Sequence, residues 1–316
     1  MSHLSLCARG IAYSYPSGTE PLAGATIDIP PASRVAILGA NGSGKTTLLK
    51  ILAGSLEPTS GTVEVDGVPL RHTRRGLRRH RQDVQLVLQD PDDQLFSADV
   101  VHDVAFGPAN LGLNGSEISE RVAEALDLLS IEPLASRPTH ELSYGERKRV
   151  TIAGAMAMRP CVLLLDEPSA GLDPAGVEEM FQALDKLEKN HTTVVLSTHD
   201  TALAYEWADS VAVVHGGAVR QGPPDEILRD GNVMTAARLR PPWLIELWDR
   251  LHAREVDLPR SVPRNTDECA QHIAELLQLR NTAWQLYFTP ECGTEMDRAG
   301  SRECQLSGGS GSGASV

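Results

Sequence analysis

Residues 39–46 read GANGSGKT, a pattern whose residue types suit the binding of phosphate groups. Gly39, Gly42 and Gly44 let the backbone turn and bring its N–H groups against phosphate oxygens. Lys45 can reach the β- and γ-phosphates of a nucleotide, and the hydroxyl of Thr46 can bind Mg²⁺. A chance glycine-rich turn is the alternative. An apolar strand before the loop and a helix after it argue against that alternative.

Two adjacent carboxylates, Asp166 and Glu167, end a second apolar run. Asp166 is placed to hold Mg²⁺ through water, and Glu167 to orient or deprotonate an attacking water. Taken alone, such a pair is better explained as solvated carboxylates at a sheet edge. Its combination with the phosphate loop favours the catalytic interpretation.

A third segment, Leu142–Glu146, contains a capping box, with Ser143 at the N-cap and Glu146 three residues later. The plain interpretation is an ordinary capped helix. The functional one is that this helix N-terminus attracts a phosphate. Both interpretations can hold together, because they use the same physics.

The elements that must position these residues follow from hydrophobic patterning, which predicts an α/β fold. Continuous apolar runs predict central parallel strands at 161–165 and 193–196. Other patterns predict edge strands within 4–29, strands at 34–38, 62–65 and 84–88, helices at 45–56 and 117–130, and a hairpin of 211–214 with 218–221.

The composition narrows the class of protein. The chain has 316 residues, 41% of them hydrophobic, and no run approaches the ~18 apolar residues that cross a bilayer. The N-terminus lacks the apolar region of a signal peptide. A net charge of −13 argues against nucleic-acid binding. Five dispersed cysteines fit a reducing cytosol better than a disulfide framework.

The C-terminal part differs from the rest of the chain in its amino-acid composition. Residues 233–306 hold three of the four tryptophans and predict a mostly helical extension. One helical stripe there comprises Trp243, Leu244, Leu247, Trp248 and Leu251, and another Ile273, Leu276 and Leu277. Residues 307–316 are expected to be a disordered Gly/Ser tail.

Together with Gln89, Asp173 and His199, these motifs resemble the ATP-binding cassette (ABC) ATPase domain over residues 4–229. The resemblance implies a P-loop NTPase fold at 1–232. That fold has a RecA-like parallel core, an antiparallel β subdomain and a helical subdomain at about 92–160. In this family two cassettes sandwich two ATP molecules, each with Mg²⁺.

The resemblance also assigns roles residue by residue. Glu167, His199 and Gln89 would be catalytic, and Thr46, Gln89 and Asp166 would hold Mg²⁺. The nucleotide would be bound by Tyr15 (with Tyr13 as second candidate), Gly39, Asn41, Gly42, Ser43, Gly44, Lys45, Thr46 and Thr47, and in the partner by Ser143, Gly145, Glu146 and Asp173. The usual signature is LSGGQ, whereas Tyr144 and Glu146 depart from it here. Tyr144 is expected to point away from phosphate.

The stretches 90–113 and 137–174 resemble the ATPases of energy-coupling-factor (ECF) importers, especially the cobalt type. Such ATPases work in pairs at the cytoplasmic face of the membrane, with a transmembrane coupling protein and a substrate-binding membrane protein. Residues 90–112 would form the groove for the coupling helices. The pair Asp92-Asp93 would receive arginines there or simply be solvated.

Several alternatives stay open. Cobalt is the first substrate expected, before nickel or a vitamin such as biotin, and a homodimer is permitted but not required. The extension would either hold two ATPases together or cap its own core. A soluble ABC ATPase in DNA repair or translation is the alternative class, disfavoured by the compact spacing, the single cassette and the acidic charge. An intact Glu167 and His199 argue against a purely regulatory module.

Two weaker signals are explained more simply. The basic segment 71–81 could contact lipid or a partner, but is better explained as the solvated face of a connector. Cys269 and His272, with Cys292 and Cys304, could form a metal site. Their loose spacing favours a cysteine and a histidine that merely lie on one helix.

Overall fold

The computed structural model describes residues 4–189, 192–256 and 258–287. Within it, an antiparallel sheet has the strand order β2-β1-β4-β5. Its strands are β1 (Leu6–Tyr13), β2 (Leu22–Ile29), β4 (Ser60–Val65) and β5 (Val68–Pro69). A tight turn follows β4, where Asp66 and Gly67 have φ values of 50° and 73°. Strand β1 of this sheet ends at Tyr13, and Tyr15 follows two residues later, on one side of the phosphate-loop site described below.

A six-stranded sheet forms the centre of the molecule, with the order β10-β9-β3-β8-β7-β6. Its strands are β3 (Arg34–Leu38), β6 (Val84–Val87), β7 (Val162–Asp166), β8 (Thr193–Thr198), β9 (Ser210–His215) and β10 (Ala218–Gly222). All neighbours are parallel except β9 and β10, which form the predicted hairpin. The segments after β3, β6, β7 and β8 therefore meet at one edge, where ligands bind in such sheets.

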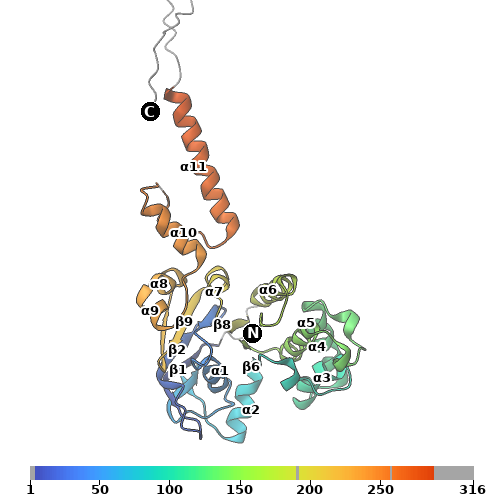
Figure 1. Ribbon diagram of the computed structural model, residues 1–316. Coiled ribbons are helices and arrows are strands. Elements are labelled where there is room, and N and C mark those ends of the chain that lie inside the picture. The colour runs from blue at the N-terminus through green and yellow to red at the C-terminus, as the bar shows by residue number, and fades with distance from the viewer. Residues whose placement is uncertain (1–3, 190–191, 257, 288–316) are drawn as a thin grey trace, which may run out of the picture. The chain divides into compact units, whose positions relative to one another are not determined.

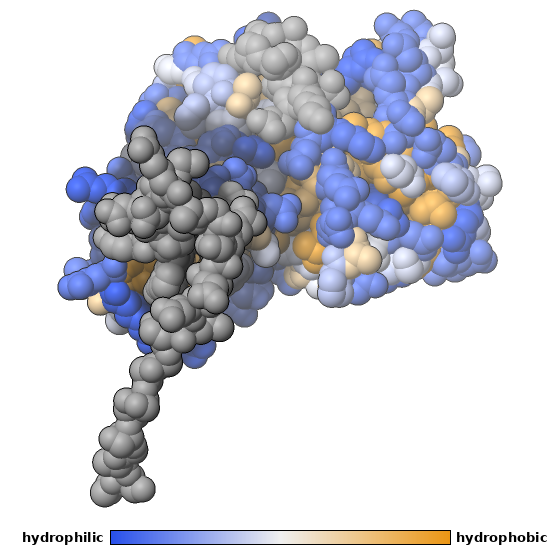
Figure 2. Space-filling view, turned by 90° about the horizontal axis from the view of Figure 1, so that it is seen from above, coloured by the Kyte–Doolittle hydropathy of each residue, from blue (hydrophilic) through white to orange (hydrophobic). Residues whose placement is uncertain are grey.

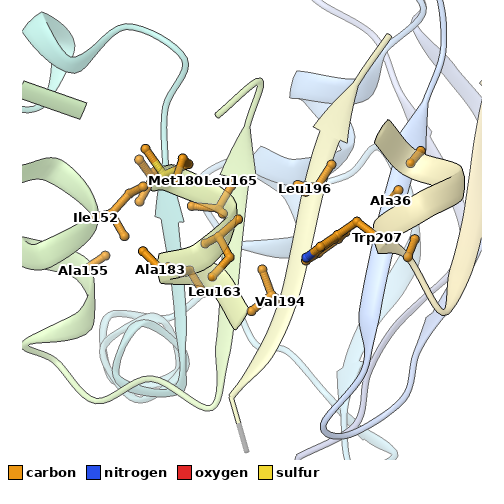
Figure 3. Packing of buried hydrophobic residues seen from close by; sticks show 14 of the residues in the cluster. Ala36, Ile152, Ala155, Leu163, Leu165, Met180, Ala183, Val194, Leu196 and Trp207 are labelled. Carbon is orange, nitrogen blue, oxygen red and sulfur yellow. The ribbon is translucent and has the colours of Figure 1, made fainter. Parts of the chain in front are cut away.

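The central strands are buried on both faces, as their unbroken apolar runs predict. Alternate residues point to opposite sides, so Ala36 and Leu38 join one hydrophobic core while Val35 and Ile37 join the other. Figure 3 shows the first core, where Met180 of α6 (Pro174–Lys189) packs beside Leu163 and Leu165 of β7. Such two-sided packing holds the strand ends rigidly.

Two groups of helices accompany the sheets in Figure 1, apart from those of the C-terminal region. Those around the central sheet are α1 (Lys45–Leu52), α2 (Arg74–Asp83), α6, α7 (Thr201–Trp207) and α8 (Pro224–Arg229). A separate helical subdomain contains α3 (Val100–Asn110), α4 (Gly115–Leu128) and α5 (Tyr144–Met156), with short 3₁₀ turns at Pro91–Asp93, Glu132–Leu134 and Thr139–Glu141. The basic segment forms helix α2, and its arginines are exposed, as expected for the solvated face of a connector. Thr73 caps it by accepting a hydrogen bond from Gly76 N–H.

The C-terminal region is helical where it is described, with α9 (Gly231–Ala236), α10 (Trp243–His252) and α11 (Thr266–Tyr287). By compactness the chain divides into Met1–Cys269 and Ala270–Val316. Within the first unit, Trp248 is fully buried and its indole N–H donates to the Pro259 carbonyl at 3.0 Å. Leu244 and Trp248 of the tryptophan stripe are therefore buried by residues of the same chain. The tail expected at 307–316 lies outside the described residues.

Among the described residues, no helix is both long and apolar enough to cross a bilayer.

Candidate functional site

The phosphate loop lies between β3 and α1 at the edge of the central sheet. Its sharp turn requires glycine at position 44, where φ is 106° and a Cβ would lie 2.9 Å from the Pro21 carbonyl oxygen. The loop borders a hollow of about 400 Å³. The hollow is lined by Tyr15, Thr19, Pro21, Asn41, Gly42, Ser43, Gly44, Lys45, Thr46, Thr47, Gln89 and Glu167. Most predicted nucleotide-binding residues are thus together.

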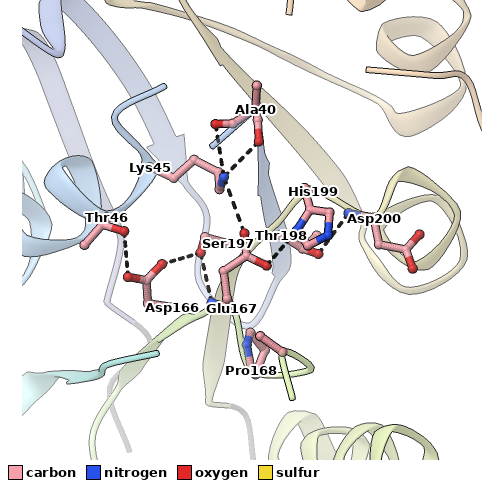
Figure 4. A network of polar contacts seen from close by, with 12 residues as sticks. Ala40, Lys45, Thr46, Asp166, Glu167, Pro168, Ser197, Thr198, His199 and Asp200 are labelled. Carbon is pink, nitrogen blue, oxygen red and sulfur yellow. Dashed lines mark hydrogen bonds and ion pairs between the residues drawn. The ribbon is translucent and has the colours of Figure 1, made fainter. Parts of the chain in front are cut away.

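Lys45 reaches from the start of α1 across the loop. Its Nζ donates to the Gly39 carbonyl at 2.8 Å and lies 3.4 Å from Glu167 Oε1, as Figure 4 shows. Beside it, the Ser43 hydroxyl is buried without a hydrogen-bond partner among the described residues. A buried ammonium group and a donor hydroxyl in one glycine-rich loop suit an anionic ligand such as a phosphate group.

Asp166 presents both carboxylate oxygens to neighbouring hydroxyls. Thr46 Oγ1 donates to Oδ2 at 2.7 Å, and Ser197 Oγ of β8 donates to Oδ1 at 2.6 Å. Gln89 lines the same hollow. Mg²⁺ prefers oxygen ligands and keeps several waters, so Thr46, Gln89 and Asp166 fit this ion. When bound, the ion would neutralise charge on the phosphate oxygens.

Glu167 follows β7 with a positive φ of 46°, an uncommon conformation for a residue with a side chain. Its backbone N–H donates to Ser197 Oγ at 3.0 Å, and its carboxylate oxygens lie near Lys45 Nζ and 3.2 Å from His199 Nδ1. The carboxylate is therefore aimed at the phosphate loop. Strain at a residue so placed is typical of functional sites.

Tyr15 lines the hollow, and His199 lies beside the hollow's Glu167. His199 follows β8, and its side chain is 64% exposed, so one ring nitrogen meets Glu167 while the ring remains accessible. Tyr15 lines the hollow and its hydroxyl lies 2.9 Å from Thr47 Oγ1. Tyr13 packs edge-on against Tyr15 but does not line the hollow. The geometry favours Tyr15 over Tyr13 as the stacking ring.

The segment at 142–146 forms the capping box that its sequence predicts. Ser143 Oγ accepts from Glu146 N–H at 3.3 Å, and Glu146 Oε2 accepts from Ser143 N–H at 2.7 Å. The hydrogen bond from Ser143 N–H lowers the pKa of Glu146, helped by Arg137, whose guanidinium is 3.2 Å from Glu146 Oε1. The charge of this unusual glutamate is thus compensated within its own chain.

The signature residues do not meet the phosphate loop of the same chain. The described residues that line the hollow do not include Ser143, Gly145, Glu146 or Asp173. In Figure 1, α5 lies in the helical subdomain and α1 beneath the central sheet. Asp173 instead accepts a hydrogen bond from Gly176 N–H at the start of α6. The predicted site is therefore present as two separated halves.

An apolar surface lies on the helical subdomain. Phe96 and Phe106 are 63% and 49% exposed. Their rings meet edge-on, with the ring centroids 4.5 Å apart. Figure 2 shows orange side chains at the surface on the side where α3, α4 and α5 lie. Nearby, Asp92 pairs with Arg147 of its own chain at 3.1 Å. Of the acidic pair at 92 and 93, only Asp93 has no ion pair among the described residues.

The C-terminal metal hypothesis gains no support. Cys269 is buried, and the described part of the chain contains no group of three or more His, Cys, Asp or Glu side chains able to hold a metal ion. Cys292 and Cys304 lie outside the described residues.

Two residues around Glu167 escaped the sequence analysis. Ser197 binds both Asp166 and Glu167, and Lys148 of α5 contacts the backbone that follows Glu167. Ser197 could have been found from its position, because a polar residue in a buried apolar strand, two residues before His199, indicates a hydrogen-bonding role. Nothing in the local sequence marks Lys148, whose contacts depend on the packing of α5.

Comparison with known proteins gives consistent matches. Residues 22–170 match the ABC transporter family. The chain is 46% identical over 271 residues to the cobalt import ATP-binding protein CbiO of Rhodobacter capsulatus, covering 85% of this chain and 97% of that protein. It is 42% identical over 244 residues to the energy-coupling factor transporter ATP-binding protein EcfA of Methanosphaera stadtmanae, covering 77% and 88%.

The fold agrees with a solved structure of the same kind. CbiO1 of Clostridium perfringens, described as part of the ABC transporter complex cbiONQ, is 40% identical and superposes with a TM-score of 0.67. The similarity covers 78% of this chain and 100% of that one. The expected parallel core, antiparallel sheet and helical subdomain are confirmed.

Proposed function

This chain belongs to the ABC transporters, as an ATP-binding subunit of the energy-coupling-factor type, and we propose that it powers an importer for cobalt ions. It binds ATP with Mg²⁺ and hydrolyses it in step with transport. The relative named for cobalt import, at 46% identity, supports this substrate. Nickel and a vitamin such as biotin are the alternatives, because in such importers another chain recognises the substrate.

One observation carries the hydrolytic part of the proposal. Glu167 lies between Lys45 and His199, with its carboxylate directed at the phosphate loop. A carboxylate there can take the proton from a water that attacks the terminal phosphate. Lys45 supplies positive charge for the phosphate oxygens, and His199 orients Glu167. Positioning and charge are the main contributions that proteins make to phosphoryl transfer.

A second copy of the chain would complete the site. Because Ser143 and Gly145 lie apart from the phosphate loop of their own chain, they are available to the nucleotide held by a partner. The capped N-terminus of α5 then offers N–H groups to the terminal phosphate. Since one chain holds both halves, a homodimer has two complete sites. Closure of the dimer on Mg-ATP would move the membrane partners.

The membrane partners proposed are a transmembrane coupling protein and a substrate-binding membrane protein. The exposed rings of Phe96 and Phe106 on the helical subdomain give an apolar surface that a coupling helix can cover. The chain would thus be held peripherally at the cytoplasmic face of the membrane.

ATP-dependent dimerisation of the purified chain tests the shared site. With Glu167→Gln, which slows hydrolysis, Mg-ATP should convert a monomer to a dimer in size-exclusion chromatography with light scattering. Adding Ser143→Arg should abolish the dimer, because a bulky side chain would block the partner's phosphate. The control Ser116→Arg, at an exposed position on α4, should leave the dimer intact. A dimer that survives Ser143→Arg would refute the shared site.

A further inference from the structure

Helix α5 contacts the catalytic loop of its own chain through a buried lysine. Lys148 is 2% exposed, and its Nζ donates to three backbone carbonyls. The acceptors are Glu167 at 2.8 Å, Pro168 at 2.9 Å and Ala170 at 2.8 Å. All three N–H bonds of the ammonium group are therefore used on a single turn of backbone.

The burial of this charge calls for an explanation. Burial lowers the pKa of Lys148 to about 8, although the charges of Glu167 and Asp166 act in the opposite direction. An apolar side chain of similar length would fill the same space without desolvating a charge. What an apolar side chain cannot do is bind three carbonyls at once. The lysine therefore fixes the conformation of the turn at 167–170.

That turn needs support because it begins with a strained residue. Glu167 has a φ of 46°, and its carbonyl also accepts from Ala170 N–H at 3.1 Å. Ser197 holds the N–H side of Glu167 and Lys148 holds the carbonyl side. Strained conformations persist only when surrounding contacts determine them from several directions.

Tyr144, one helical turn before Lys148, extends the same contact. Its ring packs on Gly171, where a Cβ would lie 2.7 Å from Tyr144 Cε1, and its hydroxyl donates to the Gln89 carbonyl at 3.3 Å. The ring centroid is 5.6 Å from Lys148 Nζ, within the range of a cation–π contact. The unusual tyrosine in the signature thus connects α5 to the segments after both β6 and β7.

We propose that Lys148, supported by Tyr144, is a positioning residue that links the signature end of α5 to the catalytic carboxylate of the same subunit. The proposal rests on the function above in that Glu167 is the group positioned. Ser143 at the N-cap of α5 would contact the partner's nucleotide. The placement of α5 by that contact would then be transmitted through Lys148 to the backbone of Glu167. Each site would so depend on the occupancy of the other.

Steady-state ATP hydrolysis by the full chain tests the proposal. Lys148→Met removes the three donors but keeps the length of the side chain. We expect kcat to fall roughly 10- to 100-fold, as for other residues that orient catalytic groups. The affinity for ATP should stay within about twofold, because Lys148 makes no contact with the phosphate loop. Lys148→Gln, which retains two N–H donors, should restore part of kcat.

Arg149→Met provides a matched control on the next residue of the same helix. Arg149 pairs with Glu179 of α6 at 2.7 Å and contacts none of the catalytic residues, so kcat should remain near that of the wild type. An unchanged kcat in Lys148→Met would overturn the proposal. So would equal losses of kcat and ATP affinity with a lowered melting temperature in all three variants, since a general loss of structure would then explain them.

Amide hydrogen exchange separates this proposal from the proposed function. Exchange at Glu167 and at residues 169–171 should be faster in Lys148→Met and Tyr144→Gly than in the wild type, whether or not the chain hydrolyses ATP. Unchanged exchange there would contradict the positioning role. A wild-type chain that binds but does not hydrolyse ATP, with faster exchange in the variants, would refute the catalytic assignment and leave the link intact.

Discussion

Glu167 is held by residues from three elements that are distant in sequence. Lys45 of α1 lies near its carboxylate, Ser197 of β8 accepts from its N–H, and Lys148 of α5 donates to its carbonyl. Each contact constrains a different part of the residue. The strained backbone and the direction of the side chain are thus properties of the assembled fold.

Replacing Glu167 by glutamine should lower kcat by roughly 10²–10⁴-fold, because the amide cannot accept a proton from water. The affinity for ATP should be retained, since the phosphate loop is unchanged. Single-turnover hydrolysis and equilibrium binding of ATP would measure the two effects. Glu132→Gln, at an exposed position, is the control and should have wild-type activity. Unchanged turnover in Glu167→Gln would refute the role of this carboxylate.

The stability of the protein should depend on pH through Lys148. Its folded pKa, about 8, lies below the ordinary value of 10.5. Between these values the unfolded chain binds more protons than the folded chain, so this group makes the free energy of unfolding rise with pH. Chemical denaturation at pH 7.5, 9 and 10 should show wild type gaining stability relative to Lys148→Met. A relative loss with rising pH would show that the pKa is not lowered.

Individual site residues could be predicted from the sequence where they belong to a local motif. Residues 41–46 of the phosphate loop, together with Glu167 and Gln89, were predicted and line one hollow, and Asp166 accepts a hydrogen bond from Thr46 beside it. Their roles remain predictions. Lys148 and Ser197 were missed because their partners are fixed only when α5 meets the loop after β7 and β8 pairs with β7.

Among the secondary-structure elements, those with strong hydrophobic patterns were predicted best. Buried strands such as β7 and β8 follow from unbroken apolar runs, and the β9–β10 hairpin from the glycines at 216 and 217. Helix α2 was not predicted, because five of its ten residues are arginines and Leu77 is its one aliphatic residue, too few for an apolar period. Its helicity follows from the Thr73 cap and from the burial of His80 against the Leu52 carbonyl.

Helix α10 gives a test of how the C-terminal helices are held. Trp248→Ala should lower the free energy of unfolding by about 3–5 kcal/mol, since a fully buried indole and its hydrogen bond to Pro259 would be lost. Trp243→Ala, on the same helix but half exposed, should change it by less than about 0.5 kcal/mol. Equal effects in urea denaturation would contradict the assignment of α10 to the chain's own core.

For the whole molecule, the separation of the two half-sites is the decisive feature. A chain whose phosphate loop and signature helix lie apart can bind ATP alone but, on this proposal, hydrolyses it efficiently only when paired. Helix α5 would then act on two ATP sites. It would present Ser143 to the nucleotide held by the partner, and through Lys148 it would hold Glu167 of its own chain. The expectation of cobalt came only from the resemblance to a family, because on this proposal another chain recognises the transported substrate.

The most direct test is uptake of labelled cobalt by cells that express the chain together with its membrane partners. Cells with the wild-type chain should accumulate the label, and cells with Glu167→Gln should show only background uptake despite equal expression. Cobalt uptake that is the same with the variant as with the wild type would contradict the proposal that ATP hydrolysis at Glu167 powers cobalt import.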